Sequence, residues 1–359
     1  ISYFFGKRIH RMNRRGCSTA IPTIIFAFVL CLILACGIVL YDVTSIRNYV
    51  NGRSRLNRKI SAFYYDRFYD EIPETRKTAD EPVKHKNESP TALDDIFISV
   101  KTTGKFHQSR VQIIIDTWFR DAKLQTYFFT DIDDANFVQQ TGGHMVNTLC
   151  NKTHTRKDLS CKLGAEYDHY MKSNKRWWCH FDDDNYVNVG RLVAMLRDVN
   201  HTKDFYIGKP SLNYPFVTTY EGEEVRFWFA TGGAGLCISR ALAIKMKPWC
   251  SDGGIYQTSE KLRAPDDCTL GFIISNRLAV QLTESNLLHS HLEILNKLNP
   301  ATLTEQVVSL SYGLGAKRQN FIQLNDSRFN IPISEDPTRF RTLHCIIQSD
   351  LCKHSVRPY

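Results

Sequence analysis

The stretch that decides the fold is Trp177-Trp178-Cys179-His180-Phe181-Asp182-Asp183-Asp184, an apolar run that ends in three consecutive acids. The run predicts a buried strand, with the acids at its carboxyl end. Three neighbouring carboxylates repel one another, and removal from water strengthens that repulsion. A divalent cation relieves it, and carboxylates are hard ligands that suit Mg²⁺ or Mn²⁺. Because open α/β sheets bind ligands at the carboxyl ends of strands, the stretch predicts a metal-assisted nucleotide site.

A solvated acidic turn is the alternative interpretation of the triplet. Such a turn would open the next helix, with Asp184 or Asn185 as the N-cap. The two tryptophans and the phenylalanine just before the acids favour the buried site, because they place the triplet at the edge of an apolar core.

Strand and helix patterns alternate along the rest of the body. Strands are predicted at residues 95–100, 125–130, 144–148, 176–181, 205–208, 226–229 and 279–282. Helices are predicted at 108–119, 158–170, 189–199, 240–246 and 267–275. This alternation predicts an α/β fold with a mainly parallel central sheet flanked by helices.

An uncharged segment near the N-terminus predicts a membrane anchor. Residues 21–41 are almost wholly apolar, which is long enough for a helix to span a bilayer. Five basic residues precede them, so residues 1–20 are expected to be a cytoplasmic tail and the later chain to be lumenal. A cleaved signal peptide competes with this interpretation, but its apolar core usually spans only about 7–15 residues. The polar residues 42–92 are expected to form a stem, and 93–359 a lumenal domain.

The net charge of +9 belongs to the membrane flank and the stem. Residues 1–60 hold ten Lys or Arg and one acid, whereas the other 36 Lys or Arg are matched by 36 Asp or Glu. The lumenal body is therefore near neutral, and no nucleic acid is expected as a partner.

Cysteines and sequons agree with a lumenal location. Eight of the eleven cysteines lie beyond the anchor, and an even number in an oxidising compartment suggests disulfides. No Cys-x-x-Cys pair occurs, so a zinc ribbon is not expected. Four Asn-x-Ser/Thr sequons fall on the predicted lumenal side, at Asn87, Asn151, Asn200 and Asn325.

Two glycine-containing turns are candidates for a donor-binding site. The first strand leads into Thr102-Thr103-Gly104 and then Arg110, and such a turn can present backbone N–H groups to a diphosphate. Most turns of this kind only reverse the chain. Residues 227–229 lead into Gly232 and Gly233, where the missing Cβ lets a ligand approach the backbone closely. A tight turn packed against a neighbouring strand is the alternative.

Acids and histidines further along supply a candidate base and a second metal ligand. Asp266 and Asp267 begin a predicted helix, where an N-cap needs one acid and the second could act as a general base. His289 and His291 lie on a later loop, and only one of them can point toward the triplet if the segment is extended. A nucleotide, a divalent metal, a base and a lumenal compartment together suggest a sugar-nucleotide transferase.

The motifs taken together resemble the fringe glycosyltransferases. The resemblance is carried by residues 95–100, 178–188, 227–235, 265–269, Phe272 and 289–293, in order within 93–352. It implies a GT-A fold on a single-pass type II anchor in the Golgi membrane. It also implies Mn²⁺-dependent, inverting β-1,3 transfer of N-acetylglucosamine from UDP-GlcNAc to O-linked fucose. The acceptors would be EGF-like repeats of Notch and its ligands, so that transfer modulates Notch signalling.

The resemblance also implies roles for the candidate residues. Asp184 and His291 would bind the metal, and Asp267 would be the catalytic base. The donor would be bound by Arg110, Thr102, Asp182, Asp183, Gly232 and Gly233. Disulfides would join Cys150 to Cys161, Cys179 to Cys237, and Cys345 to Cys352; pairing of the remaining Cys250 with Cys268 is our own extension. Residues 213–224 and the tail after Asn325 match the family less well.

Two other functions compete with this one. A Golgi β-1,3-galactosyltransferase would share the metal and the base, but residues 180–186 favour the fringe family. A catalytically silent lumenal glycan-binding protein would be expected to have lost the acids or the base, and both are present here.

Overall fold

The computed structural model describes residues 89–315, 318–324, 327–329 and 331–349. The expected cytoplasmic tail and anchor, and nearly all of the expected stem, lie outside these ranges. Within the ranges, no helix has both the length and the apolar composition that a bilayer crossing requires.

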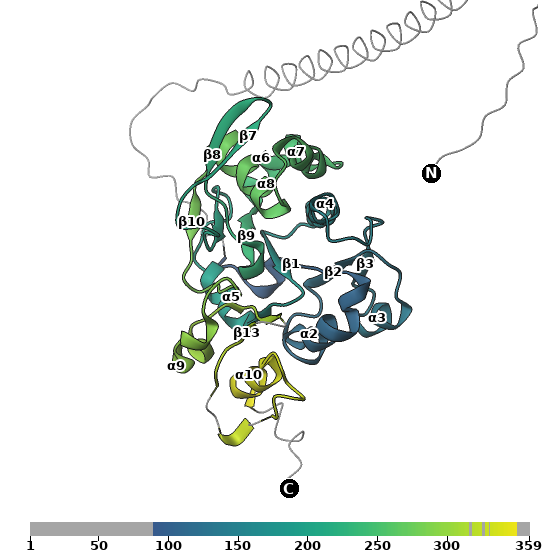
Figure 1. Ribbon diagram of the computed structural model, residues 1–359, viewed down its shortest axis with the longest axis vertical. Coiled ribbons are helices and arrows are strands. Elements are labelled where there is room, and N and C mark those ends of the chain that lie inside the picture. Colours follow the sequence, from purple (N-terminus) through teal and green to yellow (C-terminus); the bar gives the residue numbers. More distant parts are fainter. Residues whose placement is uncertain (1–88, 316–317, 325–326, 330, 350–359) are drawn as a thin grey trace, which may run out of the picture. The chain divides into compact units, whose positions relative to one another are not determined.

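A seven-stranded sheet forms the centre of the fold, in the order β10-β6-β9-β4-β1-β2-β3 (Figure 1). Its strands are β1 (Ile96–Lys101), β2 (Thr126–Thr130), β3 (Met145–Asn147), β4 (Trp177–Asp182), β6 (Tyr206–Gly208), β9 (Leu236–Ser239) and β10 (Leu282–Glu284). Neighbouring strands pair in parallel except at β9, which runs antiparallel to β4 and β6. The predicted α/β fold with a mainly parallel sheet is confirmed.

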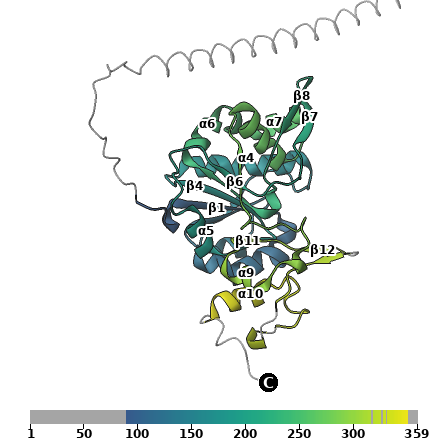
Figure 2. The same cartoon turned by 90° about the vertical axis from the view of Figure 1, so that its left-hand side faces the viewer.

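Helices cover both faces of this sheet, as two perpendicular views show (Figure 1, Figure 2). One face carries α4 (Arg156–Lys172), α6 (Arg240–Cys250), α7 (Gly254–Leu262) and α8 (Asp266–Phe272). The other carries α2 (Gln112–Asp116), α3 (Ala135–Gln140), α5 (Val189–Leu196), α9 (Pro300–Glu305) and α10 (Phe340–Ile347). Each face has its own apolar core, and β1 contributes Ile98 to one and Phe97 to the other. Because strand side chains alternate, Ser99 and Lys101 lie on the Phe97 face with α4.

Three predicted elements differ from the structure. The helix predicted at 108–119 is broken: His107–Val111 is a π-helix, α2 follows, and the chain bends at Thr117 into the 3-10 turn Trp118–Asp121. The strand predicted at 279–282 lies instead at β10, because Ala279 has φ 55° in the left-handed region and cannot extend a strand.

The strand predicted at 226–229 does not belong to the central sheet. It corresponds to β8 (Glu223–Phe227), which pairs with β7 (Phe216–Tyr220) in a separate hairpin. This hairpin extends from the body at the end that carries α7 (Figure 2). The strand of the central sheet is β9, which follows the glycine turn and was not predicted, since its four residues give no period of their own.

Two short strand pairs bring the later chain to the acid triplet. β5 (Tyr186–Val187) pairs with β11 (Ser309–Leu310), and β12 (Gly313–Gly315) pairs with β13 (Arg318–Asn320). Since β5 follows the triplet directly, the first pair places residues after 309 beside it.

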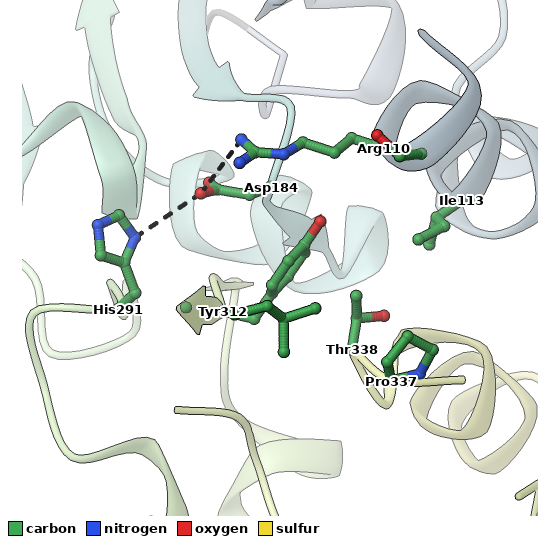
Figure 3. Close-up of a pocket in the computed structure, with 10 residues that line it drawn as sticks. Arg110, Ile113, Asp184, His291, Tyr312, Pro337 and Thr338 are labelled. Carbon is green, nitrogen blue, oxygen red and sulfur yellow. Dashed lines mark ion pairs between the residues drawn. The ribbon is translucent and has the colours of Figure 1, made fainter. Parts of the chain in front are cut away.

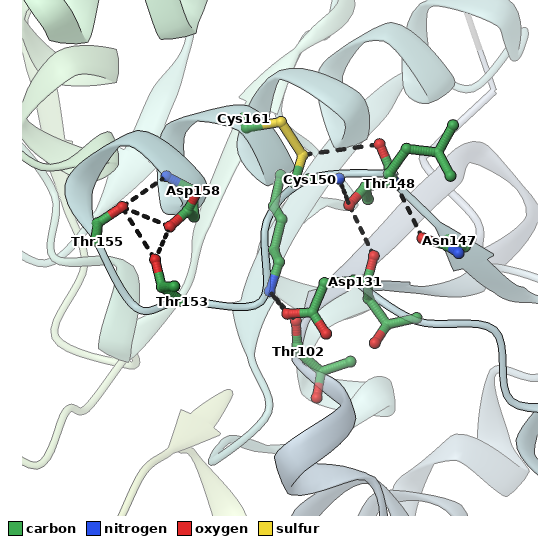
Figure 4. Close-up of a disulfide and its surroundings, with 12 residues drawn as sticks. Thr102, Asp131, Asn147, Thr148, Cys150, Thr153, Thr155, Asp158 and Cys161 are labelled. Atoms are coloured by element: carbon green, nitrogen blue, oxygen red, sulfur yellow. Dashed lines mark hydrogen bonds and ion pairs between the residues drawn. A yellow bond between two sulfur atoms is a disulfide. The ribbon is translucent and has the colours of Figure 1, made fainter.

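Two of the implied disulfides are present. Cys150–Cys161 ties the loop after β3 to α4 (Figure 4). Cys179–Cys237 joins β4 to β9, where the two residues face each other in register. Cys352 lies outside the described residues, so the pair Cys345–Cys352 stays a prediction.

The pairing of Cys250 with Cys268 is wrong, because both thiols are free and buried. Cys250 ends α6 with its thiol near Asp168, whereas Cys268 lies in α8 beside Asp267. Burial raises the pKa of both thiols. They therefore act as small apolar side chains of the core on the α4 face.

Candidate active site

The acid triplet lies at the carboxyl end of β4, where the strand enters a tight turn. The backbone N–H of Asp182 donates to the Asn185 side chain at 2.8 Å. The Asn185 amide donates in turn to the carbonyl of Gly233 at 2.9 Å, which ties the triplet to the glycine turn. The N-cap of α5 is Asn188, and the last two acids are buried. The interpretation of a solvated turn that caps the next helix is therefore wrong.

Asp183 joins two of the predicted donor-binding residues. Its Oδ2 accepts from the Thr102 hydroxyl at 2.8 Å, and its Oδ1 accepts from Arg110 at 2.7 Å. The Arg110 guanidinium also lies 3.8 Å from the centre of the Phe106 ring, a cation–π contact that fixes its plane. Burial raises the pKa of Asp183, and the Arg110 charge opposes that rise. Arg110 thus balances one charge of the triplet.

A buried ion pair from the side of α4 holds the turn after β1 in place (Figure 4). Lys162 of α4 donates to Asp131 at 2.6 Å and to the carbonyl of Thr102 at 2.8 Å. The other oxygen of Asp131 accepts from the Gly104 N–H at 3.0 Å. The expectation that this turn offers its backbone to a diphosphate is therefore wrong at Gly104, because Asp131 already uses that N–H.

Asp184 and His291 face each other at one side of a cavity (Figure 3). The Oδ2 atom of Asp184 lies 3.7 Å from Nδ1 of His291 and 3.7 Å from Nη1 of Arg110. Its Oδ1 atom is buried and has no hydrogen-bond partner among the described residues. Burial, together with the charges of Asp182 and Asp183, raises the pKa of Asp184 to about 8. A second positive group near this carboxylate would stabilise its ionised form.

The arrangement around Asp184 fits a divalent cation that is shared with a ligand. An unpartnered, buried carboxylate oxygen is a group that such a cation stabilises. In the described ranges, no group of three or more His, Cys, Asp and Glu side chains could hold a metal by itself. Asp184 and His291 would therefore supply two ligands and leave other positions to water and a diphosphate, as is common for Mg²⁺.

The cavity beside this pair measures about 480 Å³. It is lined by Ser109, Arg110, Ile113, Asp184, His291, Tyr312, Gly313, Leu314, Pro337 and Thr338. Figure 3 shows Asp184 joined by ion pairs to Arg110 and His291, with Tyr312 beside them and Pro337 farther from Asp184. The cavity thus has a charged end and an aromatic, apolar end. These suit a nucleotide, whose diphosphate is charged and whose nucleobase is aromatic.

Asp267 lies in the first turn of α8, partly exposed. Its Oδ2 accepts from the Gly232 N–H at 3.2 Å, and its Oδ1 accepts from the Cys268 N–H at 2.8 Å. Burial and the adjacent charge of Asp266 raise the pKa of Asp267 to about 6. A carboxylate with this pKa is ionised at neutral pH and is a stronger base than an ordinary aspartate, as general-base catalysis requires.

Asp266 does not cap α8, so that part of the sequence interpretation is wrong. The N-cap residue is Pro265, which makes no side-chain cap bond. Asp266 is buried instead, and its Oδ2 accepts from Lys101 at 2.6 Å. The acid that sequence reasoning assigned to the helix thus belongs to an ion pair with the end of β1.

Gly232 and Gly233 form a buried wall between the base and the metal candidates. A methyl group on Gly232 would lie 3.7 Å from Cβ of Asp267 and 3.8 Å from Oδ2 of Asp182. A methyl group on Gly233 would lie 3.3 Å from Cε1 of His291. Because the two glycines lack side chains, the backbone lies close to Asp267 on one side and to His291 on the other.

His291, and not His289, faces the triplet. His289 is buried, and its Nδ1 lies 3.0 Å from the Glu293 carboxylate. Glu293 also accepts from Lys209 at 2.9 Å and from the Ser290 N–H at 3.1 Å, which anchors the loop. His291 projects from this anchored loop toward Asp184.

Two residues of the site were missed by sequence reasoning. Lys101 had a recognisable signal, because it is a lysine at the carboxyl end of a buried strand, one residue before Thr102. Tyr312 carried no signal, because its place beside Arg110 depends on the β5–β11 pairing across more than 120 residues.

Known proteins similar to this chain include fringes of several vertebrates. The chain is 45% identical over 298 residues to a β-1,3-N-acetylglucosaminyltransferase lunatic fringe of Danio rerio, covering 80% of this chain and 79% of the relative. It is 45% identical over 266 residues to the Homo sapiens protein of that name, covering 73% and 69%. A radical fringe of Notophthalmus viridescens is 44% identical over 285 residues, covering 76% and 71%.

Solved structures resemble the chain only distantly. A crystal structure of GalNAc-T7 with UDP, GalNAc and Mn²⁺ has a TM-score of 0.34 and 9% identity, covering 66% of this chain and 45% of that one. A likeness at that level carries no argument about the site. The family model described as Fringe-like, by contrast, matches residues 91–351. With this match and its close relatives, the chain belongs to the Fringe-like family of glycosyltransferases.

Proposed function

We propose that this protein is a GT-A glycosyltransferase that transfers N-acetylglucosamine from UDP-GlcNAc to O-linked fucose on EGF-like repeats. The observation that carries the proposal is that two consecutive glycines contact the two key groups: Gly232 lies beside Asp267, and Gly233 lies beside His291. A base and a metal-binding pair on one wall are what transfer from a nucleotide sugar to a hydroxyl requires. The names of the relatives supply the sugar and the β-1,3 linkage.

Asp184 and His291 are the proposed ligands of Mn²⁺. When bound, the ion supplies positive charge at the diphosphate that leaves. Arg110 adds a second positive charge on the same side, 3.7 Å from Asp184. Asp183, oriented by Thr102 and Arg110, is the proposed acceptor of a hydrogen bond from a hydroxyl of the donor.

Asp267 is the proposed base. Its carboxylate takes the proton of the fucose 3-hydroxyl as that oxygen bonds to the anomeric carbon of N-acetylglucosamine. The bond from that carbon to UDP breaks on the opposite face, and its electron pair stays on the diphosphate. One displacement of this kind inverts the anomeric centre and gives a β-linkage. Gly232 holds the base through its N–H.

The proposed location is the Golgi membrane, with the catalytic domain in the lumen. The apolar residues 21–41, preceded by basic residues, support a type II anchor. The disulfides support an oxidising compartment. The sequon residues Asn151 and Asn200 are exposed, as glycosylation requires, whereas Asn87 and Asn325 lie outside the described residues. The proposed acceptors are the O-fucosylated repeats of Notch and its ligands, and the proposed consequence is modulated Notch signalling.

A donor screen tests this function. The chain is incubated with an O-fucosylated EGF-like repeat and UDP-GlcNAc or UDP-galactose, with Mn²⁺ or with a chelator, and an unfucosylated repeat is the control. The expected product is β-1,3-linked N-acetylglucosamine on fucose, formed only with Mn²⁺. Transfer of galactose instead would identify a galactosyltransferase. Binding of the repeat without transfer from any donor would indicate a glycan-binding protein.

A further inference from the structure

Lys101 ends β1 on the face that carries α4 and α8, and it is buried. Its register partner in the neighbouring strand is Asp182, the first acid of the triplet. The Nζ atom lies 3.1 Å from Oδ1 of Asp182 and 2.6 Å from Oδ2 of Asp266. One ammonium group therefore bridges the strand that bears the triplet and the helix that bears Asp267.

The bridge acts next to the candidate base. Asp266 and Asp267 are consecutive, and only Asp266 is neutralised by a direct ion pair. Asp266 and Lys101 are the charged groups that act on Asp267, whereas the nearby Tyr206 phenol and Cys268 thiol are neutral and have their own pKa raised by Asp267. Among them only Lys101 is positive, and its charge favours the ionised base, whereas the charge of Asp266 opposes it.

A second buried ion pair supports the bridge from the side of α4. The Glu166 carboxylate lies 2.6 Å from Nδ1 of His180 and accepts from the Ser99 hydroxyl at 2.6 Å. Nε2 of His180 lies 3.6 Å from the same Asp182 oxygen that faces Lys101. Burial lowers the pKa of His180, but the Glu166 charge raises it to about 9. Asp182 is thus held between two cations, and neither cation is a candidate metal ligand.

We propose that Lys101 is a positioning residue for the transfer reaction. Its ammonium group fixes the start of α8, which carries the proposed base Asp267, against the end of β4, which carries the acid triplet. The inference rests on the proposed role of Asp267 as the base. Without the Lys101 ammonium, Asp266 would be a buried carboxylate with no cation, and its charge would act on Asp267 unopposed. The start of α8 would also lose its direct ion pair to the sheet. Both effects weaken proton removal from the acceptor.

The test compares Lys101→Met with Lys101→Arg, and Lys162→Met is the matched control. Lys162 also makes a buried ion pair, with Asp131, but it holds the turn after β1 and not α8. Each variant is checked for folding by circular dichroism and thermal unfolding. Turnover on an O-fucosylated EGF-like repeat is then measured from about pH 5 to 9 with saturating UDP-GlcNAc and Mn²⁺.

Lys101→Met is expected to lower turnover at pH 7 at least about tenfold. Its acidic limb should move upward by about one pH unit, since a neighbouring opposite charge shifts a carboxyl pKa by roughly that much or more. Lys101→Arg keeps the charge, so the midpoint of its acidic limb should lie close to that of the wild type. Lys162→Met should leave the midpoint of the acidic limb unchanged, even if its thermal stability falls as far as that of Lys101→Met. A folded Lys101→Met protein with an unmoved limb and wild-type turnover would overturn the proposal.

A second readout separates this claim from the function itself. The carboxyl carbon of Asp267 is titrated by NMR in protein labelled with ¹³C-aspartate and assigned with Asp267→Asn. Lys101→Met should raise its midpoint, and an unchanged midpoint would contradict the positioning role. If the wild-type protein transferred no N-acetylglucosamine, the proposed function would fail, and this titration would still decide whether Lys101 governs Asp267.

Discussion

The backbone N–H of Gly232 donates a 3.2 Å hydrogen bond to Oδ2 of Asp267, which fixes the carboxylate against the glycine turn. A methyl group on the same glycine would lie at van der Waals distance from three side chains: 3.7 Å from Cβ of Asp267, and 3.8 Å from both Oδ2 of Asp182 and Nε2 of His180. Gly232 therefore orients the candidate base and lets the backbone lie close to the carboxylates of Asp267 and Asp182.

Gly232→Ala should preserve the fold and impair the reaction. The added methyl would make contacts of 3.7 and 3.8 Å, which are ordinary van der Waals distances, so thermal stability should stay near that of the wild type. The methyl occupies the space between Asp267 and Asp182, and turnover should fall at least about tenfold through misplacement of the acceptor. Gly190→Ala, at an exposed position of α5, is the control and should keep full turnover. Equal turnover in both variants would show that Gly232 does not border the reacting groups.

Asp184→Ala should abolish Mn²⁺-dependent binding of UDP without unfolding the protein. The carboxyl group is buried, and burial and the other two acids raise its pKa to about 8, so the fold disfavours its ionised form and does not depend on it. Isothermal calorimetry with UDP, with and without Mn²⁺, measures the effect, and thermal unfolding checks the fold. Unchanged Mn²⁺–UDP affinity in a folded variant would remove Asp184 from the metal site.

The pH profile should report the ionisation of Asp267. Burial and the charge of Asp266 raise its pKa to about 6, and only the ionised form can accept a proton. Turnover should therefore rise through about pH 6 and level off above it, provided that the metal and the donor are saturating. The profile of a folded Asp267→Asn variant should lack this limb. Persistence of the limb in that variant would assign it to another group.

Glu293→Gln should weaken the binding of Mn²⁺ and UDP by loosening the loop that carries His291. Burial opposes ionisation of Glu293, but hydrogen bonds from His289 and Lys209 lower its pKa to about 2. The stabilisation is present above the unfolded pKa of about 4.5 and is lost as the pH falls toward 2. Calorimetry at pH 7 should show a loss of several fold in affinity. Wild-type affinity in this variant would mean that the loop is held by other contacts.

The sequence predicted the sheet and the residues at its carboxyl edge well. Apolar runs such as residues 95–100 and 176–181 are long enough to be recognised, and a parallel sheet gathers the residues after its strands at one edge. For that reason Thr102, Asp183 and Asp184 meet as expected, and Arg110 joins them from the next segment.

Residues whose role depends on tertiary contacts were not predictable in the same way. Asp266 resembled a helix cap because its partner, Lys101, is 165 residues away. The Gly104 N–H looked free because Asp131 follows a different strand. Tyr312 reaches the cavity only through the pairing of β11 with β5. None of these contacts has a local pattern, so propensity and spacing could not reveal them.

The catalytic assignment is tested most sharply by the turnover of Asp267→Asn on an O-fucosylated EGF-like repeat with UDP-GlcNAc and Mn²⁺. The substitution keeps the size of the side chain and removes its basicity. Turnover is expected to fall at least about 100-fold, with Mn²⁺–UDP affinity unchanged, because the proposed base would contact the acceptor and not the diphosphate. A folded variant whose turnover stays within a few fold of the wild type would contradict the assignment of Asp267 as the base.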